Sequence, residues 1–228
     1  MTITSQEQVA LLTDYDDNSA YSIAYQRLYA SIRLNWNSDQ VKQQSILLAT
    51  PKSYAEQATA AANIAIASAQ SGTPTILVDA DLHTPGLYQR FGVGEQAGFY
   101  DLLQAESITS QRIDACLSKT FVPELRLLGA GKVQPQTKET NLLFSAHLRD
   151  IVTGLHSYLA ETESRPAMII FHTTPVLAGI EASCISTLVE QTFLVIVAGQ
   201  TTRGQARQAH EQLQRAHAKL VGAVLLNV

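Results

Sequence analysis

SILLATPKSYAEQATAAANIAIASAQ, residues 45–70, joins a short apolar run, a polar loop and an alanine-rich segment. The apolar run Ser45–Ala49 predicts a buried strand, and Ala55–Gln70 predicts a helix that ends before the next glycine. A strand, a short loop and a helix in this order form the unit in which many α/β proteins hold a nucleotide phosphate. The loop Thr50–Thr59, however, contains no glycine, and its one lysine, Lys52, comes early. The unit predicts the fold class and leaves open whether the loop binds a phosphate.

Predicted strands and helices alternate along most of the remaining chain. The strands MIIF and FLVIV are continuously hydrophobic, as is typical of strands buried on both faces of a parallel sheet. We therefore predict an α/β fold, with a mostly parallel sheet and helices on both faces. No linker divides the sequence, so we expect one domain over residues 18–228, preceded by a disordered segment over residues 1–17. The other helices are expected at residues 18–36, 85–92, 98–104, 142–159, 181–189 and 202–218, and the other strands at 75–78, 125–131 and 220–226.

The composition excludes several classes of protein. With a formal net charge of −4 and no run of lysine or arginine, the sequence gives no indication of nucleic-acid binding. No apolar stretch is long enough to cross a bilayer and no signal-peptide pattern opens the sequence, so direct membrane insertion is not expected. The two cysteines, Cys116 and Cys184, lack metal-ligand spacing, and reduced thiols fit a cytoplasmic protein.

Two carboxylates follow the predicted strand that ends at Val78. Asp79 and Asp81 are separated by one residue, so strand alternation places both on the same side at the ligand edge of the sheet. They are suited to hold Mg²⁺ through waters or to accept a proton from an attacking hydroxyl. The alternative is that Asp79 caps the next turn while Asp81 is solvated. His172, at the end of the strand MIIF, has three interpretations: a metal ligand, a base, or a partly buried polar side chain.

Three longer stretches resemble the cytoplasmic domain of bacterial tyrosine kinases: ILVDADLHTPGLYQRFG, MIIFHTTPVL and AGQTTRGQARQAHEQLQRAHAKLVGAVLLNV. AYQRLYASIRLNW is similar to the first helix of that family, GFYDLLQ to its G-L-x-D-L-L segment, and GAGKVQPQTKE to its nucleotide-base loop. The family belongs to the deviant P-loop ATPases, alongside the Par/Min partition proteins. The resemblance implies a doubly wound, P-loop NTPase-like fold. It also implies a role beside the polysaccharide co-polymerases of capsule and exopolysaccharide export.

The phosphate loop of that family resembles S-P-x-x-G-E-G-K-S-T, and residues 50–59 align with it without a gap. Tyr54 and Glu56 stand where the family has glycines, whose backbone N–H groups approach the phosphates. Gln57 replaces the phosphate-binding lysine and carries no charge, and Ala58 offers Mg²⁺ no side-chain oxygen. The resemblance thus implies a degenerate cofactor-binding position made of Lys52, Tyr54, Glu56, Gln57, Ala58 and Thr59.

Other positions of the resemblance differ as well. His172 replaces the aspartate that ends the corresponding strand, and an imidazole does not anchor hydrated Mg²⁺ in the same way. We therefore expect no metal at Asp79 and His172, the family's magnesium positions. Lys52 either has the role of the extra lysine of the Par/Min proteins, whose spacing it shares, or is simply solvated. Asp79 and Asp81 remain from the catalytic set and would act only in an active enzyme.

The predicted first helix carries a tyrosine stripe with two interpretations. Tyr21, Tyr25 and Tyr29 form either a contact surface, since tyrosine is enriched at interfaces, or a face that packs inward. The E-x-x-R-x-x-R pattern through which some relatives form rings is replaced by Ile23, Gln26 and Tyr29. Ring formation through salt bridges of that pattern is therefore not expected.

Taken together, these features favour a catalytically deficient kinase-like domain, a pseudokinase, that acts as a scaffold or regulatory partner in capsule or exopolysaccharide synthesis and export. Its expected partners are a polysaccharide co-polymerase of the membrane, a related kinase domain or a second copy of the chain. A partner would recruit this cytoplasmic protein to the inner face of the membrane, and no cofactor is expected. The alternatives are an active tyrosine kinase or ATPase that uses ATP and Mg²⁺, and a partition-type switch that dimerises on nucleotide. The sequence leaves open the polysaccharide system, the oligomeric state and whether the chain is part of a longer membrane protein.

Overall fold

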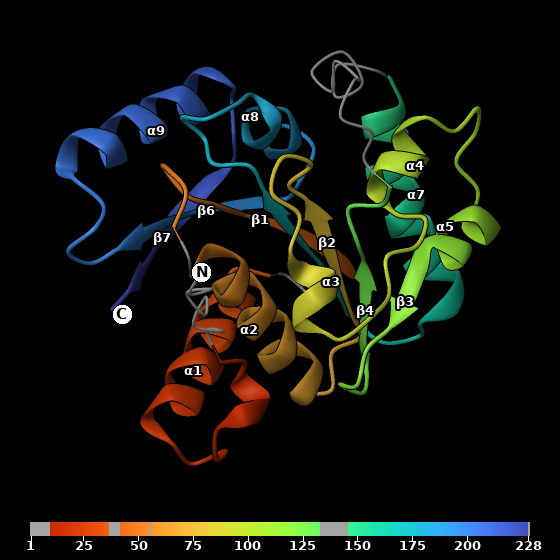
Figure 1. Ribbon diagram of the computed structural model, residues 1–228, viewed down its shortest axis with the longest axis horizontal. Coiled ribbons are helices and arrows are strands. Elements are labelled where there is room, and N and C mark those ends of the chain that lie inside the picture. The colour runs from red at the N-terminus through yellow and green to blue at the C-terminus, as the bar shows by residue number, and fades with distance from the viewer. Residues whose placement is uncertain (1–9, 37–41, 55, 133–145, 228) are drawn as a thin grey trace, which may run out of the picture.

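Strands and helices alternate along the chain (Figure 1) in the computed structural model, which describes residues 10–36, 42–54, 56–132 and 146–227. The strands are β1 (Gln43–Ala49), β2 (Thr75–Ala80), β3 (Leu117–Lys119), β4 (Leu125–Leu128), β5 (Ala167–Thr173), β6 (Gln191–Val197) and β7 (Leu220–Leu226). The helices are η1 (Leu12–Asp14), α1 (Ala20–Leu34), α2 (Gln57–Gln70), α3 (Leu87–Arg90), α4 (Phe99–Leu103), α5 (Ser110–Cys116), α7 (Ala146–Thr162), α8 (Glu181–Ser186) and α9 (Arg203–Arg215).

All of these strands belong to one sheet, in the order β3-β4-β2-β5-β1-β6-β7. Neighbouring strands are parallel except for β3 and β4, which are antiparallel. β1, β2 and β5 are buried along almost their whole length, which explains the apolar run at the centre of each. The sheet confirms the predicted α/β fold with a mostly parallel, doubly wound arrangement.

Helices cover both faces of the sheet and enclose two apolar cores. One core lies under α1, α2 and α3, and its largest fully buried side chains include Ile32, Ile64 and Leu87. The other lies under α4, α5, α7, α8 and α9 and contains Phe99 and Phe171. α1 packs beside α2 on the first face (Figure 1). These layers leave the carboxyl ends of β1, β2, β5 and β6 together at one edge.

Three short elements were not predicted from the sequence: η1, described below, and α5 and β3. α5 begins after Thr109, whose side chain accepts a hydrogen bond from the Arg112 N–H at 3.2 Å, and β3 is the antiparallel strand that follows it. Neither is long enough to show a clear hydrophobic period. α1 begins at Ala20 and not at residue 18 as predicted, because the Ser19 hydroxyl caps it by accepting from the Ser22 N–H at 3.0 Å. Of the predicted nucleotide-base loop, residues 129–132 are described and the remainder, from residue 133 on, lies outside the described residues.

The prediction that residues 1–17 are disordered is wrong for residues 10–17, the part of this segment that the structure describes. Leu12–Asp14 form the 3₁₀ helix η1, and Leu11 and Leu12 are 6% and 2% exposed. The Leu12 N–H donates to the Asn63 side-chain oxygen at 2.8 Å, which ties the segment to α2. Two leucines in a polar stretch are enough to anchor it, since burying each contributes about 1.5–3 kcal/mol.

The tyrosine stripe of α1 packs inward. Tyr25 and Tyr29 are buried, and the hydroxyls of Tyr29 and Thr73 are hydrogen-bonded at 2.6 Å. The Asn63 amide donates to the Tyr21 hydroxyl at 2.8 Å. The stripe therefore faces α2 and not a partner. In the described part of the chain, no helix combines the length and apolarity needed to cross a bilayer.

Candidate functional site: a closed phosphate-loop position

The loop between β1 and α2 is fixed at its start by backbone hydrogen bonds. The Val176 N–H donates to the Thr50 carbonyl at 2.9 Å, and the Leu177 N–H donates to the Pro51 carbonyl at 3.1 Å. Both donors belong to the turn that follows β5, the neighbour of β1 in the sheet. The loop thus begins in the strand-end position where α/β proteins bind ligands.

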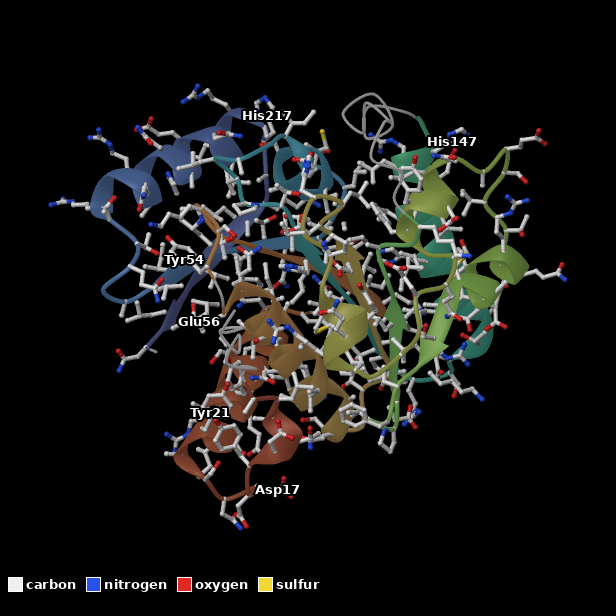
Figure 2. The ribbon with its side chains drawn as sticks, viewed as in Figure 1. Asp17, Tyr21, Tyr54, Glu56, His147 and His217 are labelled. Atoms are coloured by element: carbon white, nitrogen blue, oxygen red, sulfur yellow. The ribbon has the colours of Figure 1, made fainter. Side chains whose placement is uncertain are left out.

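Tyr54 closes the loop on its other side. Its side chain is 6% exposed, and its hydroxyl is hydrogen-bonded to that of Thr201, after β6, at 2.6 Å. The Thr201 hydroxyl also accepts from the Val197 N–H at 2.9 Å, so Tyr54 is tied to the end of β6. Figure 2 shows Tyr54 and Glu56 at the start of α2. A buried ring at a position where the family has glycine leaves no room for backbone N–H groups to cradle a phosphate.

The Lys52 ammonium lies 5.6 Å from the centre of the Tyr54 ring, within the range of a cation–π contact. Lys52 itself is exposed, as the solvated interpretation expects. Tyr54 is bound on the β6 side of β1, whereas β2 and its Asp79 lie on the opposite side, beyond β5. Tyr54 therefore fills the loop itself and does not cover Asp79.

Gln57 turns back into the loop instead of pointing out of it. The Thr50 hydroxyl donates to the Gln57 side-chain carbonyl at 2.8 Å, and Gln57 is 8% exposed. At the position of the phosphate-binding lysine, this chain thus has a neutral side chain already bound within the protein. Ala58 follows it in the first turn of α2 and adds no oxygen.

Glu56 and Thr59 each leave one buried oxygen without a hydrogen-bond partner among the described residues, Glu56 Oε2 and Thr59 Oγ1. Glu56 precedes the first residue of α2 with a φ of −87°, and its side chain does not cap the helix. The non-glycine residues with positive φ in the described chain are Glu124 and His217, so neither Tyr54 nor Glu56 needs the freedom of glycine. The described residues of the loop adopt backbone angles open to ordinary residues, and Glu56 places a carboxylate beside the position where a phosphate would lie.

Asp79 and Asp81 are both fully buried and serve the turn that follows β2. Asp79 accepts hydrogen bonds from the N–H groups of Gly86 and Leu87 at 3.2 and 3.1 Å, and so caps α3. Asp81 accepts from the Thr84 N–H at 3.0 Å, the Thr84 hydroxyl at 2.8 Å and the Thr174 hydroxyl at 3.1 Å. The capping interpretation of Asp79 agrees with these contacts, whereas the idea that Asp81 is solvated is wrong.

The two carboxyl groups have opposite pKa shifts. Burial raises the pKa of Asp79 above its ordinary value, although His172 and the backbone donors act against the shift. Burial also acts to raise the pKa of Asp81, but the hydrogen bonds from Thr84, together with His172 and Thr174, outweigh it and lower that pKa. Asp81 is therefore the carboxylate whose charge the fold stabilises.

His172 lies opposite Asp79 in the β2–β5 register and is 3% exposed. A second histidine, His83, faces the buried Glu181 at the start of α8, with its Nε2 3.1 Å from a Glu181 carboxylate oxygen. Within the described chain, no group of three or more His, Cys, Asp or Glu side chains is arranged to hold a metal ion.

The sequence did not predict which residues hydrogen-bond to Tyr54 and His83. Thr201 and Glu181 are far in sequence from Tyr54 and His83, and no local pattern links them. Thr84 offered a signal, because a hydroxyl residue three positions after an aspartate is typical of a side-chain-closed turn.

The residues present do not fit a Mg²⁺–nucleotide. Tyr54 is buried where a phosphate needs bare backbone, and Gln57 and Ala58 supply neither a cation nor a hydroxyl. The oxygens of Asp79 and Asp81 accept internal donors that a metal ion would have to displace. The sheet and the strand–loop–helix unit nonetheless define a P-loop NTPase-like α/β fold.

Comparison with known proteins assigns the chain within this fold class, although no protein-family model matches it. Tyrosine-protein kinase YwqD of Bacillus subtilis is 30% identical over 199 residues, which cover 86% of this chain and 78% of that kinase. The kinase domain of Escherichia coli tyrosine kinase Etk has a TM-score of 0.76 at 19% identity, over 90% of this chain and 75% of that one. The cell division ATPase MinD of Pyrococcus furiosus has a TM-score of 0.61 at 20% identity, over 80% and 71%. The chain therefore belongs to the bacterial tyrosine kinase family.

Proposed function

We propose that this chain is a catalytically deficient member of its family, a pseudokinase that serves as a scaffold or regulatory partner. The observation that carries the proposal is the buried ring of Tyr54 in the phosphate loop, whose hydroxyl is hydrogen-bonded to that of Thr201. The intact core supports the same proposal. The sheet and both apolar cores are present, although the side chains at the phosphate and Mg²⁺ positions are replaced. A fold kept without its ligand chemistry is suited to binding other proteins.

The family of this chain suggests which class of protein it binds. We propose an active tyrosine kinase domain or the membrane co-polymerase that works with it in capsule or exopolysaccharide synthesis and export. Such a partner would hold this cytoplasmic domain at the inner face of the membrane. Binding to a protein of the same fold requires no nucleotide in this chain, which is consistent with the closed loop.

A phosphoryl-transfer assay tests the proposal. The purified chain, incubated with Mg²⁺ and ATP, is expected to release no ADP above the buffer blank and to gain no phosphotyrosine. The Etk kinase domain in the same buffer is the positive control. ADP release by this chain that falls in an Asp79→Asn variant would contradict the proposal and favour the active-enzyme alternative, since Asp79 would then act on the nucleotide.

A further inference from the structure

One tyrosine of this chain is accessible in the folded protein. All eight tyrosines lie in the described residues, and Tyr15 is the exposed one, with 41% of its surface accessible. Tyr21 and Tyr88 are partly buried, and the remaining five are buried: Tyr25, Tyr29, Tyr54, Tyr100 and Tyr158. A macromolecule that acts on tyrosine side chains without unfolding the protein would reach Tyr15 first.

The backbone around Tyr15 is suited to such access. Residues 15–19 contain neither helix nor strand and connect η1 to α1. Leu11 and Leu12 anchor the preceding residues to the core, so Tyr15 itself does not take part in that anchoring. The Tyr15 ring stacks on Tyr21 with ring centres 4.3 Å apart, and the residue still remains exposed.

The charge around Tyr15 is uniformly negative. Asp14, Asp16 and Asp17 flank it and are all exposed, and the first basic residue of the sequence is Arg27. Asp17 and Tyr21 lie away from Tyr54 and Glu56 (Figure 2), so this acidic segment is separate from the closed phosphate loop. An enzyme that bound it would need a basic surface, which would steer the two proteins together.

From these features we infer that Tyr15 is a phosphoacceptor for an active tyrosine kinase, which is the partner class of the proposed function on which this inference rests. The Tyr15 hydroxyl oxygen attacks the γ-phosphorus of ATP bound to the kinase, and a new O–P bond forms. The bond between the γ-phosphorus and the bridging oxygen breaks, and ADP leaves with its electron pair. The phenolic proton passes to a base of the kinase. The resulting phosphate stands among three aspartates and weakens the stack on Tyr21.

Phosphorylation by the Etk kinase domain with Mg²⁺ and ATP, mapped by mass spectrometry, tests the inference. The unaltered chain is expected to gain one phosphoryl group at Tyr15. A Tyr15→Phe variant is expected to lose the label, while Tyr88→Phe, a matched change at a partly buried tyrosine, keeps it. Heat-denatured Tyr15→Phe chain is expected to be labelled at other tyrosines, because folding is what shields them.

The reactions with and without Etk separate failure of the inference about Tyr15 from failure of the proposed function. Label on another tyrosine of the folded chain, or an unlabelled chain beside a labelled Glu–Tyr copolymer, would overturn the inference. Label acquired from Mg²⁺ and ATP without Etk would overturn the proposed lack of phosphoryl transfer. In that case the assignment of Tyr15 stands if the label is on Tyr15 and is overturned if it is elsewhere.

Discussion

A chain whose phosphate loop is converted back to the family pattern is expected to bind ATP where the unaltered chain does not. The variant combines four changes: Tyr54→Gly, Glu56→Gly, Gln57→Lys and Ala58→Ser. Together they open the loop, remove a carboxylate, and supply a cation and a hydroxyl for Mg²⁺. Titration calorimetry with Mg²⁺ and ATP should give a dissociation constant on the order of 10 μM, equivalent to about −7 kcal/mol.

The matched control for this variant is Tyr54→Phe. It keeps the buried ring and removes the hydroxyl that is bound to Thr201, at a cost of about 1 kcal/mol of unfolding free energy. It is expected to bind no ATP, because the ring still fills the loop. If Tyr54→Phe bound ATP as tightly as the four-change variant, the hydroxyl contact and not the ring would be what closes the loop. If the folded four-change variant bound none, these four residues would not account for the loss.

Asp81→Asn is expected to lower the unfolding free energy by about 2 kcal/mol at neutral pH, because charge-assisted hydrogen bonds from Thr84 and Thr174 are lost. The folded pKa of Asp81 lies below its unfolded value of about 4. The carboxylate therefore contributes stability that is fully present above pH 4 and is lost as the pH falls through the folded pKa. Urea unfolding of the variant and the unaltered chain should thus converge in acid.

Asp79→Asn is the matched comparison for Asp81→Asn, because the folded pKa values of the two carboxyl groups are shifted in opposite directions. Burial raises the folded pKa of Asp79, so its ionisation costs stability above that pKa and the cost disappears as the pH falls through it. At neutral pH Asp79→Asn is therefore expected to be more stable than the unaltered chain, whereas Asp81→Asn is less stable, and both differences should shrink toward acid. Differences of the same sign at neutral pH would contradict the assigned shifts.

The fold was predictable because its signals are local. β1, β5 and β6 each contain a run of at least four consecutive apolar residues, which is typical of strands buried on both faces of a sheet. Two of the elements that were missed, β3 and α5, are too short to carry a period. Leu11 and Leu12 were missed because only the tertiary contact with α2 shows that they anchor a polar segment.

The site was predictable in its location and not in its contacts. The gapless loop identified Tyr54 and Gln57 as the residues to examine, but Tyr54 is 147 positions from Thr201, and no local rule pairs them. Alternation placed Asp79 and Asp81 at the sheet edge, yet the burial of Asp81 depends on how the next turn folds over it. Long-range closure of a loop is a property of the packed structure.

Titration of the unaltered chain with ATP, in the presence and absence of Mg²⁺, tests the central claim most directly. The closed loop between Thr50 and Thr59 predicts no saturable heat in either condition, at protein concentrations where the four-change variant gives a full binding curve. Saturable binding of one ATP per chain with a micromolar dissociation constant would contradict it, because the loop that holds Tyr54 buried and hydrogen-bonded to Thr201 would then accept a phosphate.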